Sequence, residues 1–226
     1  LERIVGAAVR IADEHGAGVI GPNCIGVLTP RYSGVFTTPI PTPDPAGCTL
    51  VSGSGATAVF IMEASTALGL TFSHVFSVGN SAQNGVEEVL EYLDSVGDHA
   101  DEARRPPDAP SPILLYIESI ADPAKLLRHA RSLRKKGHRI AAIKAGSSEA
   151  GGRAASSHTG ALAGSDAAVG ALFRKAGILR CRSRAELATV GAVLSFPPLP
   201  GSRLAVVTHA GGPAVNQGPG LVLVNT

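Results

Sequence analysis

Residues 48–69 read CTLVSGSGATAVFIMEASTALG, a stretch that passes directly from one kind of secondary structure to another. CTLVS is a short apolar run typical of a buried strand, and the glycines that follow it permit a tight turn. From Gly55 onward almost every position is apolar, which predicts a helix that is buried all round. A strand, a glycine turn and a helix in immediate succession form the unit from which parallel α/β sheets are built.

The same succession of strand and helix repeats as far as residue 196. Further strands are expected at 74–79, 112–118, 138–146 and 178–182, and further helices at 85–97, 122–137, 165–177 and 184–196. In the second of these helices Asp122 is a good N-cap, and Pro123 suits the first helical position. Strands that alternate with helices form a parallel sheet covered on both faces. We therefore predict an α/β fold in which residues 48–197 form a five-stranded, doubly wound parallel sheet of flavodoxin type.

The segment before this domain is expected to belong to a different one. Residues 2–15 have helical periodicity, and AGVIGPN at 17–23 has the composition of a strand. The chain opens on Leu1, and its only methionine is Met62. We therefore expect a fragment in which residues 1–30 are the end of a preceding domain.

Proline marks the other expected boundaries. Residues 31–47 are rich in proline and lack a helical period, so we predict an extended connector. A polar, proline-rich stretch at 97–112 is expected to be a surface insertion. After a boundary at PPLPG (197–201), residues 201–226 begin a further strand and glycine loop and are expected to be an incomplete α/β unit.

Composition excludes several classes of protein. The 226 residues are 44% hydrophobic and 17% charged, which suits a globular interior. A net charge of +2 and an aromatic content of 4% argue against a nucleic-acid partner. No apolar run reaches the roughly 18 residues of a membrane span. The three cysteines lack the spacing of a metal site, so we expect no metal in this chain, reduced thiols and a cytoplasmic location.

Ligands of open α/β sheets bind beyond the carboxyl ends of the strands, which directs attention to SGSGATA at 52–58. This stretch formally matches the G-x-G-x-x-A dinucleotide fingerprint, but the next strand ends at Val78-Gly79-Asn80 without the acidic residue that such a site requires. It is not a P-loop either. Two interpretations remain: a helix N-terminus that binds a single phosphate, or a tight turn with Ser54 as N-cap.

A second candidate is the stretch KAGSSEAGGRAASSHTGALAGSD at 144–166, which contains one histidine among small residues. Its composition alone favours a flexible linker. However, a strand and a capped helix of the same domain bracket it closely, and no bulky neighbour covers His158. A neutral imidazole on a loop can act as a nucleophile, and its phosphorylation needs anion-binding amides nearby.

Glu118 ends a strand that is otherwise apolar. It is redundant as a helix cap, because Asp122 serves that purpose better. A carboxylate at this place can accept a hydrogen bond from one ring nitrogen of His158 and so fix the tautomer that attacks through the other nitrogen. The alternative is an exposed acid at the end of a strand.

Taken together, these segments resemble the NDP-forming acyl-CoA synthetases, the superfamily of ADP-forming acetate–CoA ligase and succinyl-CoA synthetase. The resemblance covers roughly residues 1–216, and its most specific block is SHTGALAG. The segments that carry it, in order, are GPNCIGVLTP (21–30), VSGSGA (51–56), FSVGNSAQNGVEEVLEYL (76–93), YIESI (116–120), IKAGSSEAGGRAASSHTGALAGSD (143–166) and VVTHAGGP (206–213).

The resemblance implies a reaction that runs from acyl-CoA and phosphate through acyl phosphate and phosphohistidine to a carboxylic acid, CoA and ATP. His158 corresponds to the phosphorylated histidine and Glu118 to the glutamate that orients it. Asn23 and Cys24 match the loop near the thioester end of CoA. The residues implied to bind phosphate are Ser52, Gly53, Ser54, Gly55, Ala56, Thr159 and Gly160.

The resemblance also implies what lies around this chain. Residues 1–30 correspond to the tail of a CoA-binding Rossmann domain, and 201–226 to the start of a second flavodoxin-like domain. Coenzyme A, ATP or ADP and phosphate are the expected cofactors, with Mg²⁺ at a nucleotide site outside the chain. An ATP-grasp domain or subunit, a small carboxylic acid or acyl-CoA substrate, and an oligomeric assembly are expected. Ser81–Asn84 lacks the acidic pattern of the acetate-type enzymes.

A second hypothesis belongs to a different functional class. In the related protein lysine acetyltransferases, this domain is a non-catalytic module that senses acyl-CoA or acts as a scaffold. The presence of both His158 and Glu118 favours the ligase, because a scaffold has no use for an oriented imidazole.

Overall fold

The computed structural model describes residues 2–37, 40–96, 112–146 and 166–197 in full, together with the backbone of 204–208 and 221–225. The chain divides into two units, residues 1–196 and 197–226, which are described separately. The second unit shows two parallel strands, β8 (Leu204–Thr208) and β9 (Leu221–Asn225), with Leu204 opposite Leu221. β8 lies where the sequence predicts a strand, and the glycine loop and helix expected after it fall outside the described residues.

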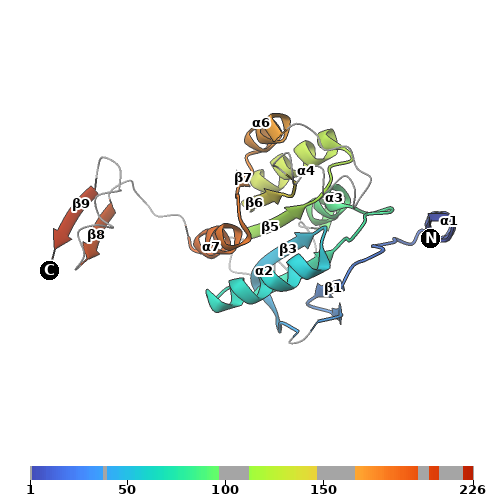
Figure 1. Ribbon diagram of the computed structural model, residues 1–226, viewed down its shortest axis with the longest axis horizontal. Coiled ribbons are helices and arrows are strands. Elements are labelled where there is room, and N and C mark those ends of the chain that lie inside the picture. Colours follow the sequence, from blue (N-terminus) through green and yellow to red (C-terminus); the bar gives the residue numbers. More distant parts are fainter. Residues whose placement is uncertain are drawn as a thin grey trace. The chain divides into compact units, whose positions relative to one another are not determined.

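A seven-stranded sheet organises the first unit in the order β2-β1-β4-β3-β5-β6-β7 (Figure 1). Neighbouring strands run parallel from β4 to β7, whereas β1 is antiparallel to both β2 and β4. The strands are β1 (Gly26–Thr29), β2 (Tyr32–Val35), β3 (Pro43–Ser52), β4 (Phe72–Ser77), β5 (Pro112–Ile117), β6 (Arg139–Lys144) and β7 (Leu179–Arg180). Numbered from β3, the parallel part has the order 2-1-3-4-5, which is the flavodoxin order and confirms the predicted fold.

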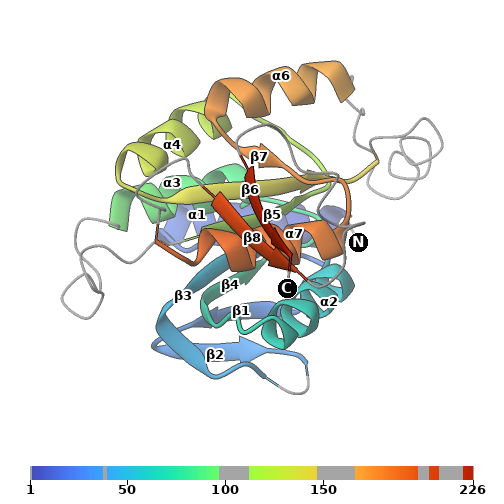
Figure 2. The same cartoon turned by 90° about the vertical axis from the view of Figure 1, so that its left-hand side faces the viewer.

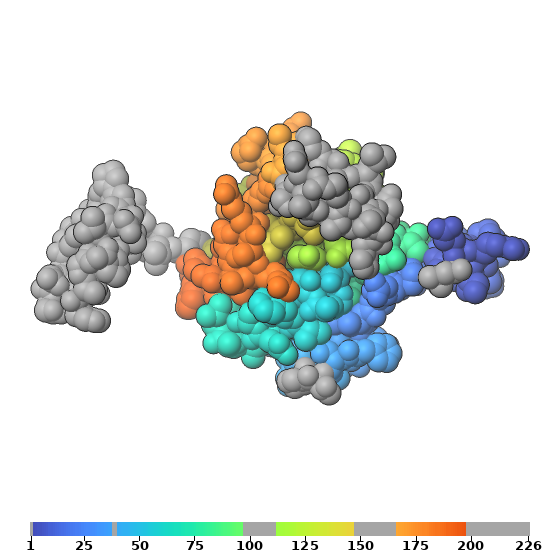
Figure 3. All heavy atoms as spheres, in the orientation of Figure 1, coloured from blue at the N-terminus to red at the C-terminus, as the bar shows by residue number. Residues whose placement is uncertain are grey.

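Helices cover both faces of this sheet (Figure 2). α2 and α7 pack together on one face, where Figure 3 shows them as neighbours, while α3, α4 and α6 cover the other. The helices are α1 (Glu2–His15), α2 (Gly55–Ala67), α3 (Val86–Val96), α4 (Pro123–Lys135), α6 (Asp166–Ala176) and α7 (Arg184–Leu194). Among the described residues, no helix is long and apolar enough to cross a membrane.

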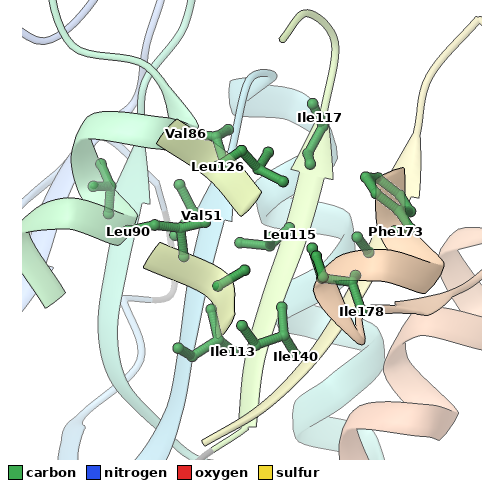
Figure 4. Close-up of a cluster of buried hydrophobic side chains, with 14 of the residues drawn as sticks. Val51, Val86, Leu90, Ile113, Leu115, Ile117, Leu126, Ile140, Phe173 and Ile178 are labelled. Atoms are coloured by element: carbon green, nitrogen blue, oxygen red, sulfur yellow. The ribbon is translucent and has the colours of Figure 1, made fainter. Parts of the chain in front are cut away.

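Each face of the sheet carries its own hydrophobic core. Figure 4 shows the core beneath α3, α4 and α6, where Val51 and Leu115 from the sheet meet Leu90, Leu126 and Phe173 from the helices. Leu50, Leu114 and Phe72 point to the opposite face and pack with Ile61 of α2 and Leu187 of α7. Adjacent residues of β3 and β5 thus enter different cores, because successive side chains of a strand point to opposite faces.

The prediction that α2 is buried all round is wrong. Ala58, Ile61 and Met62 are buried, but Phe60 is 40% exposed. The guanidinium of Arg184, on α7, lies 4.2 Å from the centre of the Phe60 ring. A cation over the face of an aromatic ring is a favourable contact at an exposed site. The Arg184 guanidinium therefore covers part of the Phe60 ring, which the hydrophobic core does not enclose.

The N-terminal expectations also differ from the structure. No strand forms at 17–23, because Gly21 and Asn23 have positive φ angles and Pro22 has no amide hydrogen. Within the predicted connector at 31–47, the structure forms β2 and the first residues of β3. The Thr29 hydroxyl closes the turn before β2 by accepting hydrogen bonds from the amides of Arg31 and Tyr32, at 3.2 and 3.0 Å.

Candidate active site

The candidate site lies at the carboxyl ends of β3 and β5, where the chain leaves the sheet in opposite directions. β3 continues into α2 on one face, and β5 continues into α4 on the other. Such a divergence between adjacent parallel strands is the switch point at which open α/β sheets bind ligands. The sequence-predicted residues Ser52–Ala56 follow β3, and Glu118 follows β5, so the fold brings these two predicted groups together.

The turn after β3 is shaped by its two serines. The Ser52 hydroxyl donates to the carbonyl of Ser54 at 2.7 Å and accepts from the Ser54 amide at 3.2 Å. The Ser54 hydroxyl caps α2 by accepting from the Thr57 amide at 3.3 Å. Within the described part of the chain, the amides of Gly55 and Ala56 meet no acceptor. The start of α2 thus presents two free donors at its positive end, which suits an anion.

The side chain of Glu118 approaches this turn closely. A Cβ placed on Gly53 would lie 3.3 Å from Cγ of Glu118, closer than most such contacts, so glycine permits the approach. Gly53 is itself fixed, because its amide donates to the carbonyl of Tyr116 at 2.9 Å. Glu118 is half-buried. Glu118, just after β5, and the turn that follows β3 therefore lie side by side.

Residues 21–25 fold over the end of β4 beside this site. The amides of Asn80 and Ala82 donate to the carbonyls of Pro22 and Gly21, each at 2.9 Å. Asn23 has a positive φ angle, and its side-chain amide donates to Oδ1 of Asn80 at 3.4 Å. A Cβ on Gly55 would lie 2.6 Å from the Ile25 side chain, which brings this loop against the start of α2. The loop that contains Asn23 and Cys24 therefore borders the turn between β3 and α2.

Sequence reasoning missed the residues that hold this loop in place. The Gln83 side chain accepts from the Val19 amide and donates to the Asp13 carboxylate, each at 2.5 Å. The Asn84 side chain donates to the carbonyl of Val19 at 2.8 Å. Their partners lie some 65 positions away in sequence, and no periodicity or motif indicates such a pairing. The sequence offered one indication, which is that residues 81–84 are polar or small and include no acidic residue.

Lys144 is a third residue that the sequence did not single out. It ends β6, and its ammonium donates to the carbonyl of Glu118 at 2.8 Å and to that of Ala145 at 2.7 Å. Burial lowers the pKa of Lys144, an effect opposed by the nearby carboxylates of Glu118 and Asp166 and reinforced by Arg180. A lysine at the end of an apolar strand was the available signal.

His158, Thr159 and Gly160 lie outside the described residues, so their predicted roles stay predictions. The described residues that bracket their segment are Gly146, just past β6, and Asp166, at the start of α6. Arg180 binds both the carboxylate and the main-chain carbonyl of Asp166. Among the described residues, no group of histidine, cysteine and acidic side chains is arranged to hold a metal ion.

Comparison with known proteins identifies the domain. Residues 45–194 match the family model described as the succinyl-CoA ligase-like flavodoxin domain. The chain is 35% identical over 208 residues to subunit alpha of ADP-forming acetate–CoA ligase II from Pyrococcus furiosus, covering 92% of this chain and 42% of the relative. It is 34% identical over 207 residues to ADP-forming acetate–CoA ligase I from Archaeoglobus fulgidus, covering 92% of this chain and 28% of the relative.

A solved structure extends the likeness to three dimensions. The acetyl-coenzyme A synthetase 1 of Ca. Korarchaeum cryptofilum, in complex with phosphate and ADP, superposes with a TM-score of 0.79 at 31% identity. The alignment covers 95% of this chain and 44% of that one, so the chain spans less than half the length of each of these relatives. With a family match over most of the chain and the flavodoxin strand order, the chain belongs to the family of succinyl-CoA ligase-like flavodoxin domains.

Proposed function

We propose that this chain is the phosphohistidine-bearing part of an NDP-forming acyl-CoA synthetase. The observation that carries the proposal is the convergence, at one switch point, of the N-terminus of α2, capped by Ser54, with Glu118. The segment that contains His158 opens from the neighbouring strand β6 at the same edge of the sheet. An anion-binding helix end, an orienting carboxylate and a nucleophilic imidazole are the groups that phosphoryl transfer through histidine requires.

The proposed chemistry has three balanced steps. Inorganic phosphate first attacks the thioester carbonyl of acyl-CoA, and the C–S bond breaks to give acyl phosphate and CoA. A ring nitrogen of His158 then attacks phosphorus, and the P–O bond to the acyl group breaks to release the carboxylate. Finally, a β-phosphate oxygen of ADP attacks the phosphorus of phosphohistidine. The P–N bond breaks, the imidazole is regenerated, and ATP is formed. Each step is reversible.

The residues of this chain have separate roles in the proposal. The start of α2, from Ser52 to Ala56, holds the transferred phosphoryl oxygens, and Gly53 leaves room for Glu118 beside them. Glu118 accepts a hydrogen bond from one nitrogen of His158 and keeps the other nitrogen unprotonated for attack. Thr159 and Gly160 complete the phosphate contacts.

The loop at Asn23 and Cys24 supports the assignment of the acyl end of CoA to this edge, because it borders Gly55. The glycines at 53 and 55 let the side chains of Glu118 and Ile25 approach the turn after β3 closely.

The proposal includes partners beyond this chain. Nucleotide binding falls to an ATP-grasp domain or subunit, and an oligomeric assembly is proposed with it. The Pyrococcus furiosus relative is named as a subunit alpha, which supports a separate nucleotide-binding partner. We also propose a small carboxylic acid as substrate, acetate being the one in the relatives' names. The three free cysteines support a cytoplasmic location.

Labelling with [γ-³²P]ATP and Mg²⁺, in the presence of the ATP-grasp partner, tests this function. We expect acid-labile, base-stable label on this chain that is absent from His158→Asn. Glu118→Gln should label about 10- to 100-fold more slowly, as is usual when the orienting partner of a histidine is lost. Glu63→Gln, an exposed carboxylate on α2, is the matched control and should label like the wild type.

A chain that never acquires label would refute the ligase and favour the non-catalytic acyl-CoA module. Thioester formation from a panel of carboxylic acids, beginning with acetate, then identifies the acyl group. Label that persists in His158→Asn would show that a residue other than His158 is phosphorylated.

A further inference from the structure

Lys144 occupies the junction between the two segments that the proposed reaction must align. It is the last residue of β6 and lies opposite Ile117, the last residue of β5. Its ammonium turns back across the strand ends and donates to the carbonyls of Glu118 and Ala145, at 2.8 and 2.7 Å. One side chain therefore joins the main chain that follows β5 to the main chain that follows β6.

This bridge continues the sheet past the point where its backbone pairing stops. The last main-chain hydrogen bond between the two strands runs from the Ala145 amide to the Ile117 carbonyl, at 2.8 Å. The carbonyls of Glu118 and Ala145 lie just beyond it. Strand ends fray when their polar groups lack partners, and the Lys144 ammonium supplies donors for both carbonyls.

The surroundings of Lys144 keep it in this bridging role. The residue is half-buried, so water competes less for its ammonium than it does at a fully exposed lysine. Charged groups of both signs lie near the ammonium. The carboxylates of Glu118 and Asp166 favour its protonated form, while the guanidinium of Arg180 opposes it. A half-buried cation that is hydrogen-bonded to two carbonyls and has two acidic neighbours is held more firmly than an exposed lysine.

We propose that Lys144 is a positioning residue for phosphoryl transfer, which fixes Glu118 relative to the start of the segment that carries His158. The inference rests on the function proposed above. Glu118 follows β5, and Ala145 follows β6 on the way to the segment that contains His158. Lys144 ties the Glu118 carbonyl to this part of the chain, and a misplacement of about 1 Å is costly for groups that take part in catalysis.

The test uses single-turnover labelling of the chain with its ATP-grasp partner and saturating [γ-³²P]ATP and Mg²⁺. Lys144→Met should lower the labelling rate constant about 10- to 100-fold, the usual effect of losing a supporting contact. The KM for ATP, obtained by repeating the labelling over a range of ATP concentrations, should stay within about twofold of the wild-type value. Lys144→Arg, which keeps a cationic donor, should recover part of the rate.

Lys136→Met is the matched control, because the Lys136 ammonium also donates to a main-chain carbonyl, that of Asp94 at 2.6 Å, on the helical layer away from the site. It should label at the wild-type rate. The proposal is overturned if Lys144→Met labels as fast as the wild type, if Lys136→Met is equally slow, or if the change is confined to KM. If Lys144→Met does not fold, the comparison of Lys144→Arg with Lys144→Gln decides, and equal rates refute the proposal.

Failure of the proposed function has a different signature. If the wild-type chain itself acquires no label, both the function and the role of Lys144 are refuted. If the wild type labels and the Lys144 variants label equally well, only the positioning role is refuted.

Discussion

At the scale of single residues, the turn from β3 into α2 carries both structural and chemical roles. Ser54 ends the extended chain with φ −129° and ψ 122°, and its hydroxyl satisfies one of the amides that every helix start leaves unpaired. The amides of Gly55 and Ala56 come next in this first turn, and the proposed function assigns them to the phosphate. The same serine thus stabilises the helix and orients the donors of the proposed phosphate site.

Ser54→Ala separates these two roles when it is compared with Ser183→Ala. Ser183 caps α7 in the same way, accepting from the Glu186 amide at 3.0 Å, but lies away from the switch point. Each substitution should lower the free energy of unfolding by about 1 kcal/mol, measured by urea denaturation. Only Ser54→Ala should also slow phosphohistidine formation. Equal labelling rates in the two variants would contradict the assigned phosphate contact.

Some of these residues could be predicted from the sequence and others could not. Ser54, Asp122 and Glu118 follow from local rules, because a cap or a strand end is defined by its immediate neighbours. Lys144 and Gln83 act on partners that are distant in sequence, and only the fold reveals those distances.

At the scale of elements, α3 and α4 are joined by a network of opposite charges. Lys125 of α4 lies 3.2 Å from Glu88 and 2.5 Å from Glu91, both on α3. His129 and Lys136 of α4 approach Asp94 of α3 at 2.8 and 3.1 Å. The acidic face of one helix thus matches the basic face of the other, with the hydrophobic core beneath them.

This network predicts a loss of stability in acid. Burial alone would raise the pKa of Asp94, but hydrogen bonds from His129, Ser132 and Lys136 outweigh it and hold the pKa below 3.8. The hydrogen bond from Lys125 holds the pKa of Glu91 below 4.5. Because both values are lower in the folded state, the stabilisation is full above these ordinary values and is lost as the pH falls through the folded ones.

Urea denaturation as a function of pH measures this effect. The free energy of unfolding should fall as the pH drops below about 4.5, and Asp94→Asn should flatten that decline. Because Glu91 is 47% exposed, solvent screens its ion pair and keeps its contribution below about 1 kcal/mol. Glu63→Gln is the control and should show the same fall in the free energy of unfolding below about pH 4.5 as the wild type. If the free energy of unfolding of Asp94→Asn falls with pH as steeply as that of the wild type, the account is contradicted.

The elements also show where sequence patterns fail. Alternating apolar strands and helices predicted the five parallel strands, because burial on both faces requires continuous apolar runs. The antiparallel β1–β2 hairpin at the sheet edge was missed, since its four-residue strands lie among prolines and lack such a run. α2 was expected to be fully buried, yet Phe60 is shielded by the Arg184 guanidinium, a contact that hydropathy does not report.

At the scale of the first unit, the N-terminal segment is held against the sheet by the loop after β4. Gln83 and Asn84 bind Val19, and the amides of Asn80 and Ala82 bind the carbonyls of residues 21 and 22. This attachment keeps the loop of Asn23 and Cys24 beside the turn between β3 and α2. The division of the chain into a CoA-binding tail at 1–30 and the flavodoxin domain remains a proposal.

Gln83→Ala tests whether this attachment is held by a single side chain. The Val19 amide donates to Gln83, so its hydrogen exchange should accelerate by at least about tenfold, the equivalent of about 1.4 kcal/mol. The Ile117–Ala145 pairing between β5 and β6 serves as an internal control, and exchange of the Ala145 amide should not change. Unaltered exchange at Val19 would show that the remaining contacts suffice.

The most direct test of the central claim is to locate the phosphoryl group on the protein. After reaction with ATP, Mg²⁺ and the ATP-grasp partner, the chain is digested at neutral pH and its peptides are sequenced by mass spectrometry with electron-transfer fragmentation. We predict one phosphorylated imidazole, at His158, that disappears on addition of ADP as ATP forms. Phosphate on a serine such as Ser54, or an unmodified His158 in a chain that still supports acyl-CoA synthesis, would contradict the account.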